Sequence, residues 1–293
     1  MTTLITGATG TVGRSLASEL AATGTPVRAL VRDAERARTL LPEGVELAVG
    51  DFTDRDSLAA AVHGVRQVFL AAPNHPEQVA WESAMIDACV AGGVRRVVKL
   101  SAHGAGHGSP VAFWDAHARI EEHLAASGPE AVVLRPTTYS TNLLASWEAI
   151  ENGVLPAPAA GARVSFIDPA DVAAVAAAAL TGRRTPGGVL TLTGPVAVGF
   201  DDAADCLARL LDHPVAFVPL GDEEALAALV GAGAPPWFAA NLVRVFAALR
   251  AGLADLTTPT VHRLIGRPPA SLWRSLRRLL VPTAPGGLLS ASR

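Results

Sequence analysis

A glycine-rich run near the beginning of the chain has the spacing of a phosphate-binding turn. It lies between a short apolar stretch and a run with helical periodicity, and reads Thr6-Gly7-Ala8-Thr9-Gly10-Thr11-Val12-Gly13. Glycines here let the backbone turn tightly and approach a diphosphate, while the first turn of the helix directs unpaired N–H groups at the anion. The motif therefore predicts a dinucleotide-binding turn, and a glycine turn without a ligand is the alternative.

The residues after the second predicted strand bear on the choice of dinucleotide. The strand ends at Val31, and Arg32 and Asp33 follow. A guanidinium pairs with the 2′-phosphate of NADP, whereas a carboxylate at this place binds the ribose hydroxyls of NAD. Because Arg32 comes first and Arg14 follows the last glycine of the turn, the sequence favours NADP(H). In the alternative, Arg32 is a solvated strand end and Asp33 binds the ribose.

Three further strand ends are expected to contact the cofactor. Asp51 and Phe52 are expected to flank the adenine, with the carboxylate accepting from its amino group. A loop of small residues is expected to close over the cofactor, and it consists of Ala71, Ala72 and Pro73. Ser101 and Ala102 follow the fifth strand, where the topology of such sheets places groups beside a nicotinamide.

Acid–base chemistry has few candidates, because Tyr139 is the single tyrosine and Lys99 the single lysine. The Tyr-x-x-x-Lys pair of short-chain dehydrogenases is absent, so we expect Ser101 to bind a substrate carbonyl. His117 shares a helix face with Glu121, and an imidazole with a pKa near neutrality would protonate a reduced carbonyl or quinone oxygen. In the alternative, His117 only forms a local hydrogen bond at the helix edge.

Histidine and cysteine spacing does not predict a metal site. His103, His107 and His117 lack a helical His-x-x-x-His frame and have no cysteine nearby. Cys89 and Cys206 lie far apart in apolar stretches, which indicates neither a disulfide nor a thiolate site and fits a reducing cytoplasm.

Composition narrows the class of protein. The 293 residues are 50% hydrophobic and carry a formal charge of -3, which predicts a globular protein without the basic surface that nucleic acid requires. The richest apolar stretch, 172–180, is too short to cross a bilayer, and the first residues lack the pattern of a signal peptide. We therefore expect a cytoplasmic protein.

The elements that must position these residues alternate between strand and helix. Strands are predicted near 2–6, 26–31, 45–49, 66–70, 95–100 and 131–135, and helices over 11–23, 33–41, 55–63, 76–92, 112–127 and 140–151. This alternation predicts an α/β fold with a doubly wound parallel Rossmann sheet over residues 1–152.

The pattern changes after residue 152. A short strand near 164–167, a helix from 168, strands near 189–193 and 214–218, and helices over 200–211, 222–232 and 236–251 predict a small α+β substrate lobe. This lobe spans 153–270, with some segments returning to the Rossmann sheet. Residues 271–293 are expected to form a basic tail, because arginines and no acidic residue occur after Leu256. Such a charge run is typical of a solvated face.

In combination these features resemble the NmrA-like, atypical short-chain dehydrogenase/reductase family. The resemblance rests on the glycine turn with Arg14, on Val31-Arg32, Gly50-Asp51, Val97-Val98-Lys99-Leu100-Ser101, His117 with Ile120-Glu121, Leu134-Arg135-Pro136, Asn142-Leu143 and Phe166-Ile167-Asp168-Pro169-Ala170-Asp171-Val172-Ala173. It implies that Arg135, Pro136, Thr137 and Thr138 line the cleft near the nicotinamide. The plant reductases of the family have a proton-transferring lysine where this chain has His117, which implies a proton donor there.

The resemblance also implies an activity. The family includes bacterial NAD(P)H-dependent quinone and triphenylmethane dye reductases and plant isoflavone and phenylcoumaran reductases. We therefore expect an NADPH-dependent reductase of a hydrophobic carbonyl, quinone or conjugated small molecule, with polyketide tailoring as an extension by analogy. The expected partner is a small hydrophobic or aromatic substrate, and we expect binding neither to nucleic acid nor to a membrane. A homodimer is one of the expected oligomeric states. A dinucleotide-binding redox sensor without catalysis, or a cyclase, epimerase or dehydratase on the same fold, is the alternative.

Overall fold

The chain forms two compact units that exchange segments along the sequence. The computed structural model describes residues 2–182 and 187–281. The first unit comprises Met1–Pro136, Pro169–Leu192 and Thr260–Arg267, and the second comprises Thr137–Asp168, Thr193–Pro259 and Pro268–Arg293. The first unit includes Pro169–Leu192 and Thr260–Arg267, which lie within the range 153–270 from which some segments were expected to return to the Rossmann sheet.

The first unit is built on a parallel sheet. Its strands are β1 (Thr2–Ile5), β2 (Val27–Val31), β3 (Glu46–Val49), β4 (Val65–Leu70), β5 (Arg96–Leu100), β6 (Glu130–Pro136) and β9 (Gly188–Leu192). Their order is β3-β2-β1-β4-β5-β6-β9, and every neighbouring pair is parallel. The sheet order reverses between β1 and β4, and in such folds ligands bind beyond the carboxyl ends of the strands at this point.

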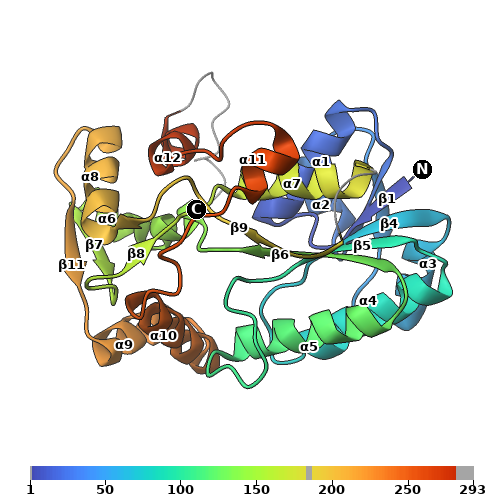
Figure 1. The fold of residues 1–293 in the computed structure, drawn as a ribbon, viewed down its shortest axis with the longest axis horizontal. Coiled ribbons are helices and arrows are strands. Elements are labelled where there is room, and N and C mark those ends of the chain that lie inside the picture. The colour runs from blue at the N-terminus through green and yellow to red at the C-terminus, as the bar shows by residue number, and fades with distance from the viewer. Residues whose placement is uncertain (1, 183–186, 282–293) are drawn as a thin grey trace. The chain divides into compact units, whose positions relative to one another are not determined.

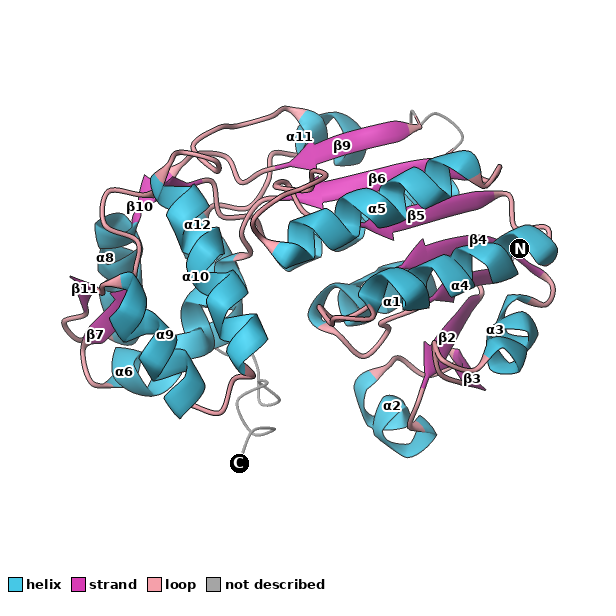
Figure 2. Cartoon of the chain, turned by 90° about the horizontal axis from the view of Figure 1, so that it is seen from below, coloured by secondary structure: helices cyan, strands magenta, loops and turns pink. Residues whose placement is uncertain are grey.

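Helices cover both faces of this sheet. They are α1 (Thr11–Ala22), α2 (Ala34–Leu40), α3 (Arg55–Val62), α4 (Gln78–Ala91), α5 (Ala112–Ala126), α7 (Pro169–Thr181) and the short α11 (Thr260–Ile265). Helices α1 and α7 pack together on one face, and α3, α4 and α5 lie on the other (Figure 1). Figure 2 shows α4 and α5 running side by side along that second face.

Apolar side chains fill the layer between the sheet and α3, α4 and α5. Leu4 of β1, Leu58 of α3, Met85 of α4 and Ile120 of α5 are all fully buried there. Burial of each such side chain contributes about 1.5–3 kcal/mol. This core fixes the positions of α4 and α5, whose first turns lie near the carboxyl ends of the strands.

The second unit combines two small strand pairs with helices. Strands β7 (Val154–Ala157) and β11 (Ala216–Pro219) pair in parallel, whereas β8 (Arg163–Val164) and β10 (Val198–Gly199) pair antiparallel. The other elements are η1 (Ser140–Ser146), α6 (Trp147–Glu151), α8 (Phe200–Leu211), α9 (Asp222–Gly231), α10 (Pro236–Arg250) and α12 (Leu272–Leu280). Phe200 lies in the core of this unit. The centroid of its ring is 5.7 Å from that of Phe166 and 5.6 Å from that of Phe217.

Several elements differ from the sequence-based expectation. The helix expected over 140–151 begins as the 3₁₀ helix η1 and becomes α-helical only at Trp147, because Ser140, Thr141 and Asn142 are poor helix formers. The expected strand 164–167 is confined to Arg163–Val164. Strands β7 and β10 and helices α11 and α12 were not anticipated.

The arginine-rich end of the chain is partly ordered by ion pairs. Residues Leu272–Leu280 form α12 rather than a tail, while residues 282–293 lie outside the described part of the chain. Arg267 pairs with Asp171 in the first unit at 2.7 Å, and Arg278 pairs with Asp168 in the second. Both aspartates are only 2% exposed in their side chains, so these two arginines serve as counterions to buried carboxylates rather than as a solvated face.

Candidate cofactor and catalytic site

The turn between β1 and α1 is packed too tightly for side chains at its glycines. Gly7 has a φ of +60°, and a Cβ atom there would lie 3.0 Å from the carbonyl oxygen of Ala71. A Cβ atom on Gly13 would lie 2.2 Å from the carbonyl oxygen of Gly7, well inside van der Waals contact. Glycine at these positions lets the first turn of α1 pack directly on the preceding backbone.

The beginning of α1 offers unpaired donors to a ligand. Gly10 is the N-cap residue and has no side chain to cap the helix, so the N–H groups of Thr11, Val12 and Gly13 have no partner within α1. In the same turn, the Nε atom of Arg14 is buried and has no hydrogen-bond partner among the described residues. A helix N-terminus and a buried guanidinium nitrogen together fit the diphosphate of a dinucleotide.

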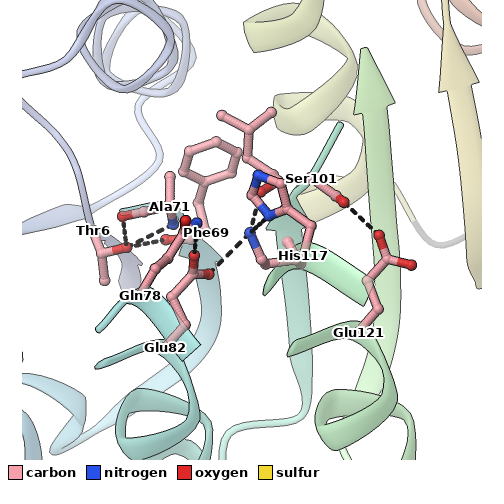
Figure 3. Close-up of polar contacts among 10 residues, drawn as sticks. Thr6, Phe69, Ala71, Gln78, Glu82, Ser101, His117 and Glu121 are labelled. Atoms are coloured by element: carbon pink, nitrogen blue, oxygen red, sulfur yellow. Dashed lines mark hydrogen bonds and ion pairs between the residues drawn. The ribbon is translucent and has the colours of Figure 1, made fainter. Parts of the chain in front are cut away.

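Thr6 ties the glycine turn to the loop after β4. Its hydroxyl donates to the carbonyl oxygen of Ala71 and accepts from the N–H of Ala71, both at 2.8 Å (Figure 3). The N–H of Thr6 also donates to the carbonyl oxygen of Phe69 at 3.0 Å. The loop that begins with Ala71, Ala72 and Pro73 therefore starts directly beside Gly7.

At the end of β2, the acidic side chain has a structural partner. Asp33 caps α2, because its Oδ1 atom accepts from the N–H of Arg36 at 3.0 Å. Arg32 is exposed at the carboxyl end of the strand. The cap engages one oxygen of Asp33. This favours the hypothesis that Arg32, rather than Asp33, contacts the cofactor at its adenine ribose.

At the end of β3, Asp51 is held in a local turn. Its Oδ1 atom accepts from the hydroxyl of Thr53 at 2.6 Å and from the N–H of Thr53 at 2.9 Å. These two hydrogen bonds lower the pKa of the Asp51 carboxyl, and the charge of Arg32 adds a smaller effect in the same direction. The carboxylate is therefore ionised. Both hydrogen bonds engage Oδ1, so Oδ2 is the oxygen that would accept from an adenine amino group.

An aromatic stack lies beside Asp51. The ring of Phe52 stacks with that of Trp81 at 6.4 Å between centroids, and Trp81 stacks with His75 at 4.1 Å. Trp81 comes from α4 and His75 from the loop before it. The sequence predicts Phe52 near the adenine but gave no reason to place Trp81 and His75 next to it.

At the end of β5, the Ser101 side chain belongs to a charged cluster. Its hydroxyl donates to Oε1 of Glu121 (Figure 3). Arg135 donates to both oxygens of the same carboxylate, from Nε at 3.0 Å and from Nη2 at 2.5 Å. The proton of Ser101 is therefore directed at Glu121, and a substrate carbonyl would have to displace that carboxylate to receive it.

His117 is held in the interior of the first unit by a chain of polar contacts. It lies in the second turn of α5 and is 8% exposed. Its Nδ1 atom is 3.2 Å from Nζ of Lys99, and that Nζ is 2.9 Å from Oε2 of Glu82 (Figure 3). Oε1 of Glu82 accepts from Nε2 of Gln78 at 2.9 Å. Lys99 and Glu82 have fully buried side chains, so the ion pair is shielded from water.

The protonation of His117 differs from the expectation of a pKa near neutrality. Burial lowers the pKa of His117 well below its ordinary value of 6.5, and the positive charges of Lys99 and Arg135 lower it further. The ring is therefore neutral at physiological pH and offers a neutral N–H group rather than an imidazolium. Burial raises the pKa of Glu82, and the ammonium of Lys99 opposes that rise.

This lowered pKa predicts an effect on stability. The unfolded chain binds a proton at His117 near pH 6.5, whereas the folded chain does not. The contribution of the neutral ring to the free energy of unfolding is therefore complete above about pH 6.5 and is lost as the pH falls toward the folded pKa. We expect wild type to lose up to about 1.4 kcal/mol per pH unit relative to His117→Gln in that range. Urea unfolding of both proteins at several pH values measures the difference, and parallel pH curves would contradict it.

The remaining predicted contact residues fall in both units. Arg135 and Pro136 end β6 in the first unit, whereas Thr137 and Thr138 belong to the second. Within the second unit, the hydroxyl of Thr137 donates to the carbonyl oxygen of Ser165 at 2.6 Å, and the carbonyl of Thr138 accepts from the N–H of Ile167 at 3.0 Å. Contact of Thr137 and Thr138 with a nicotinamide stays a prediction.

Comparison with known proteins identifies the family. The model of the NmrA-like family matches residues 1–273. The chain belongs to the NmrA-like family. The family and the doubly wound Rossmann sheet predicted from the sequence are both confirmed.

Two relatives of this NmrA-like chain align with it along nearly their whole length. It is 38% identical to (4-alkanoyl-5-oxo-2,5-dihydrofuran-3-yl)methyl phosphate reductase of Streptomyces griseus and 34% identical to NAD(P)H azoreductase of Xenophilus azovorans, each over 90% of this chain and 93% of the relative. The crystal structure of an NADPH-dependent quinone oxidoreductase of Escherichia coli, complexed with NADPH, superposes with a TM-score of 0.84 at 29% identity, covering 94% of this chain and 98% of that chain.

The buried ion pair of the NmrA-like chain was missed by sequence reasoning. One signal was present in the sequence. Lys99 is the single lysine, and it stands between apolar residues in the strand, after two valines and before Leu100. A charge at such a position needs an opposite charge nearby. Gln78 and Glu82 stand four residues apart on one face of α4, but their contact with β5 is a tertiary contact that no local spacing indicates.

Burial disfavours ionisation of two other reactive side chains of the NmrA-like chain. Burial raises the pKa of the Cys89 thiol to about 12 and also raises the pKa of the Tyr139 phenol. Within residues 2–182 and 187–281, no group of three or more histidine, cysteine or acidic side chains is placed to hold a metal ion. In the same ranges, no helix combines the length and apolar character needed to span a membrane.

Proposed function

We propose that this chain is an NADPH-dependent reductase of a hydrophobic carbonyl, quinone or conjugated small molecule. The observation that carries the proposal is the turn between β1 and α1, where the glycines, the uncapped helix and the buried Nε of Arg14 fit a diphosphate. The relatives are named as reductases of azo compounds, a furanone phosphate and quinones, which supports the same class of reaction. The chain is thus an NAD(P)H-dependent oxidoreductase.

The residues have separate tasks in this reaction. When bound, NADPH supplies the hydride that reduces the acceptor. The glycine turn, Arg14 and Arg32 hold the cofactor. His117 provides a neutral N–H group that stabilises the negative charge developing on the acceptor oxygen. The proton that completes the reduction comes from solvent, since the neutral ring is a weak acid. Ser101 is the second predicted donor, once its hydroxyl leaves Glu121.

Cofactor binding and turnover test the proposal directly. We expect the purified protein to bind NADPH in a calorimetric titration and to oxidise it when a naphthoquinone or an azo dye is added. Absence of binding to NADPH and NADH would overturn the proposal. Binding without turnover of any acceptor would favour a redox sensor, and conversion of a substrate without consumption of NADPH would favour a cyclase, epimerase or dehydratase.

Arg32 predicts the preference between the two cofactors. We expect Arg32→Ala to weaken NADPH binding about 10- to 100-fold, because a charge-assisted hydrogen bond contributes about 1.5–3 kcal/mol. NADH binding should stay unchanged, since NADH lacks the 2′-phosphate. Arg36→Ala serves as the control, because it removes an exposed arginine that lies nearby in α2. Equal weakening of NADPH and NADH binding in Arg32→Ala would rule out the contact with the 2′-phosphate.

The finer parts of the proposal concern substrate, location and assembly. A polyketide-like acceptor in secondary metabolism is supported by the relative from Streptomyces griseus. A cytoplasmic location is supported by Cys89 and Cys206, which are both free and buried. The proposed partner is a small hydrophobic or aromatic substrate, without nucleic acid, and light scattering of the purified protein tests for a homodimer.

A further inference from the structure

The ammonium of Lys99 has three N–H groups and three acceptors within reach. They are Oε2 of Glu82 at 2.9 Å, the carbonyl oxygen of Leu100, and Nδ1 of His117 at 3.2 Å (Figure 3). A protonated lysine can only donate, so the atom of His117 that faces it must accept. The contact with Glu82 is an ion pair between two fully buried side chains, and it holds the ammonium beside His117.

The same contact decides which ring nitrogen of His117 carries the proton. Because Lys99 donates to Nδ1, that nitrogen must present its lone pair. A neutral imidazole with an accepting Nδ1 carries its proton on Nε2. We propose that the buried Glu82–Lys99 pair positions His117 by fixing the Nε2–H tautomer, so that a neutral donor is always available to the acceptor oxygen. This inference rests on the proposed reductase function.

Glu82 is needed because Lys99 is fully buried. An ammonium without a counterion inside a protein loses its proton, and a neutral amine would no longer force Nδ1 to accept. Glu82 from α4 supplies that counterion, and Gln78 one turn earlier fixes the carboxylate from its other oxygen. Buried ion pairs rarely stabilise a fold better than apolar residues of the same size, so control of a neighbouring group is a physical reason to keep this pair.

The charged groups around His117 favour the neutral ring. Lys99 of β5 and Arg135 of β6 are both positive and both disfavour an imidazolium. Glu82 is engaged by Lys99, and Glu121, on the same helix as His117, is engaged by Arg135 and Ser101. The proposal therefore predicts that His117 stays in one neutral tautomer between about pH 6 and pH 8.

Nitrogen NMR of the full chain with labelled histidine tests the tautomer without reference to activity. We expect the His117 signals, assigned by their loss in His117→Gln, to show Nε2–H and an accepting Nδ1 across this pH range. An Nδ1–H tautomer or an imidazolium in wild type would overturn the proposal. A fixed Nε2–H tautomer in a protein that fails to turn over NADPH would support the positioning while disproving the reductase function.

A double variant shows whether the ion pair causes this state. Glu82→Gln with Lys99→Met removes both charges at nearly constant volume, which avoids leaving one buried charge unpaired. We expect His117 in this variant to show both tautomers and to titrate closer to its ordinary pKa of 6.5. Glu77→Gln, the same chemical change at an exposed site beside α4, is the control and should leave the tautomer unchanged. An unchanged tautomer in the double variant would overturn the proposal.

Kinetics of the same variants separate positioning from structural support. We expect the double variant to lose about 10-fold or more in kcat while the Kd for NADPH stays unchanged, because only the donor to the acceptor oxygen is affected. Its kcat should also gain a pH dependence near the new pKa of His117. A proportional loss of NADPH binding, with a flat pH profile, would indicate structural support alone and overturn the proposal.

Discussion

Gly13→Ala is expected to weaken NADPH binding strongly. The added Cβ atom would lie 2.2 Å from the carbonyl oxygen of Gly7 and 2.8 Å from Cα of Ala8, both of which are backbone atoms that cannot rotate away. The first turn of α1 must therefore move off the turn, and the N–H groups that face the diphosphate move with it. We expect NADPH affinity to fall at least about 100-fold, together with a loss of about 1–3 kcal/mol in the free energy of unfolding.

The matched control for Gly13→Ala is Gly24→Ala at the other end of the same helix. Gly24 has a φ of +70°, and nothing lies within 4 Å of an added Cβ atom. This variant should cost about 1 kcal/mol in stability from backbone strain, with NADPH binding intact. Calorimetric titration and urea unfolding measure both quantities, and NADPH binding by Gly13→Ala at wild-type affinity would show that the turn does not hold the cofactor.

Removal of the His117 ring is expected to slow reduction by about 10²–10³-fold in kcat. This is the usual effect of removing one preorganised donor to a developing oxyanion. His117→Ala should leave NADPH affinity unchanged, since the proposed site for the diphosphate is the glycine turn and not His117. His117→Gln should recover part of the rate, because its amide keeps a neutral N–H donor and a carbonyl that accepts from Lys99.

The control for His117→Ala is His123→Ala on the same helix. His123 pairs with Asp87 at 2.8 Å on the exposed side of α5 and has no expected contact with a substrate. Stopped-flow measurement of NADPH oxidation with a saturating quinone gives the rate of each variant. If His117→Ala turned over NADPH at the wild-type rate, His117 would be excluded from the mechanism.

Local patterns were sufficient to predict the strands of the first unit from β1 to β6. The glycine turn and the alternation of short apolar strands with longer helices are set by residues close in sequence, and the predicted strands through β6 agree with the observed ones within one or two residues. The cap on α2 was not predicted, because residue 33 was placed inside the expected helix 33–41 and Asp33 was considered only as a ribose ligand. That cap makes Asp33 a structural residue.

Contacts between distant segments could not be predicted in the same way. The pairing of β7 with β11 joins Val154 to Ala216. A strand was expected near 214–218, but β7 and the pairing were not. The chemistry of His117 likewise depends on Lys99 in β5 and Glu82 in α4. The residue type identified a candidate, but no local pattern indicated the buried charges that surround it and lower its pKa.

The exchange of segments between the two units limits how the protein can be divided. A fragment that ended at residue 152 would lack α7 and β9, which belong to the first unit. Its β6 would become an open edge, ready to pair with strands of other molecules, and α1 would lose the helix that packs against it. Such a fragment is expected to aggregate during expression, so a binding domain cannot be obtained by cutting the chain at residue 152.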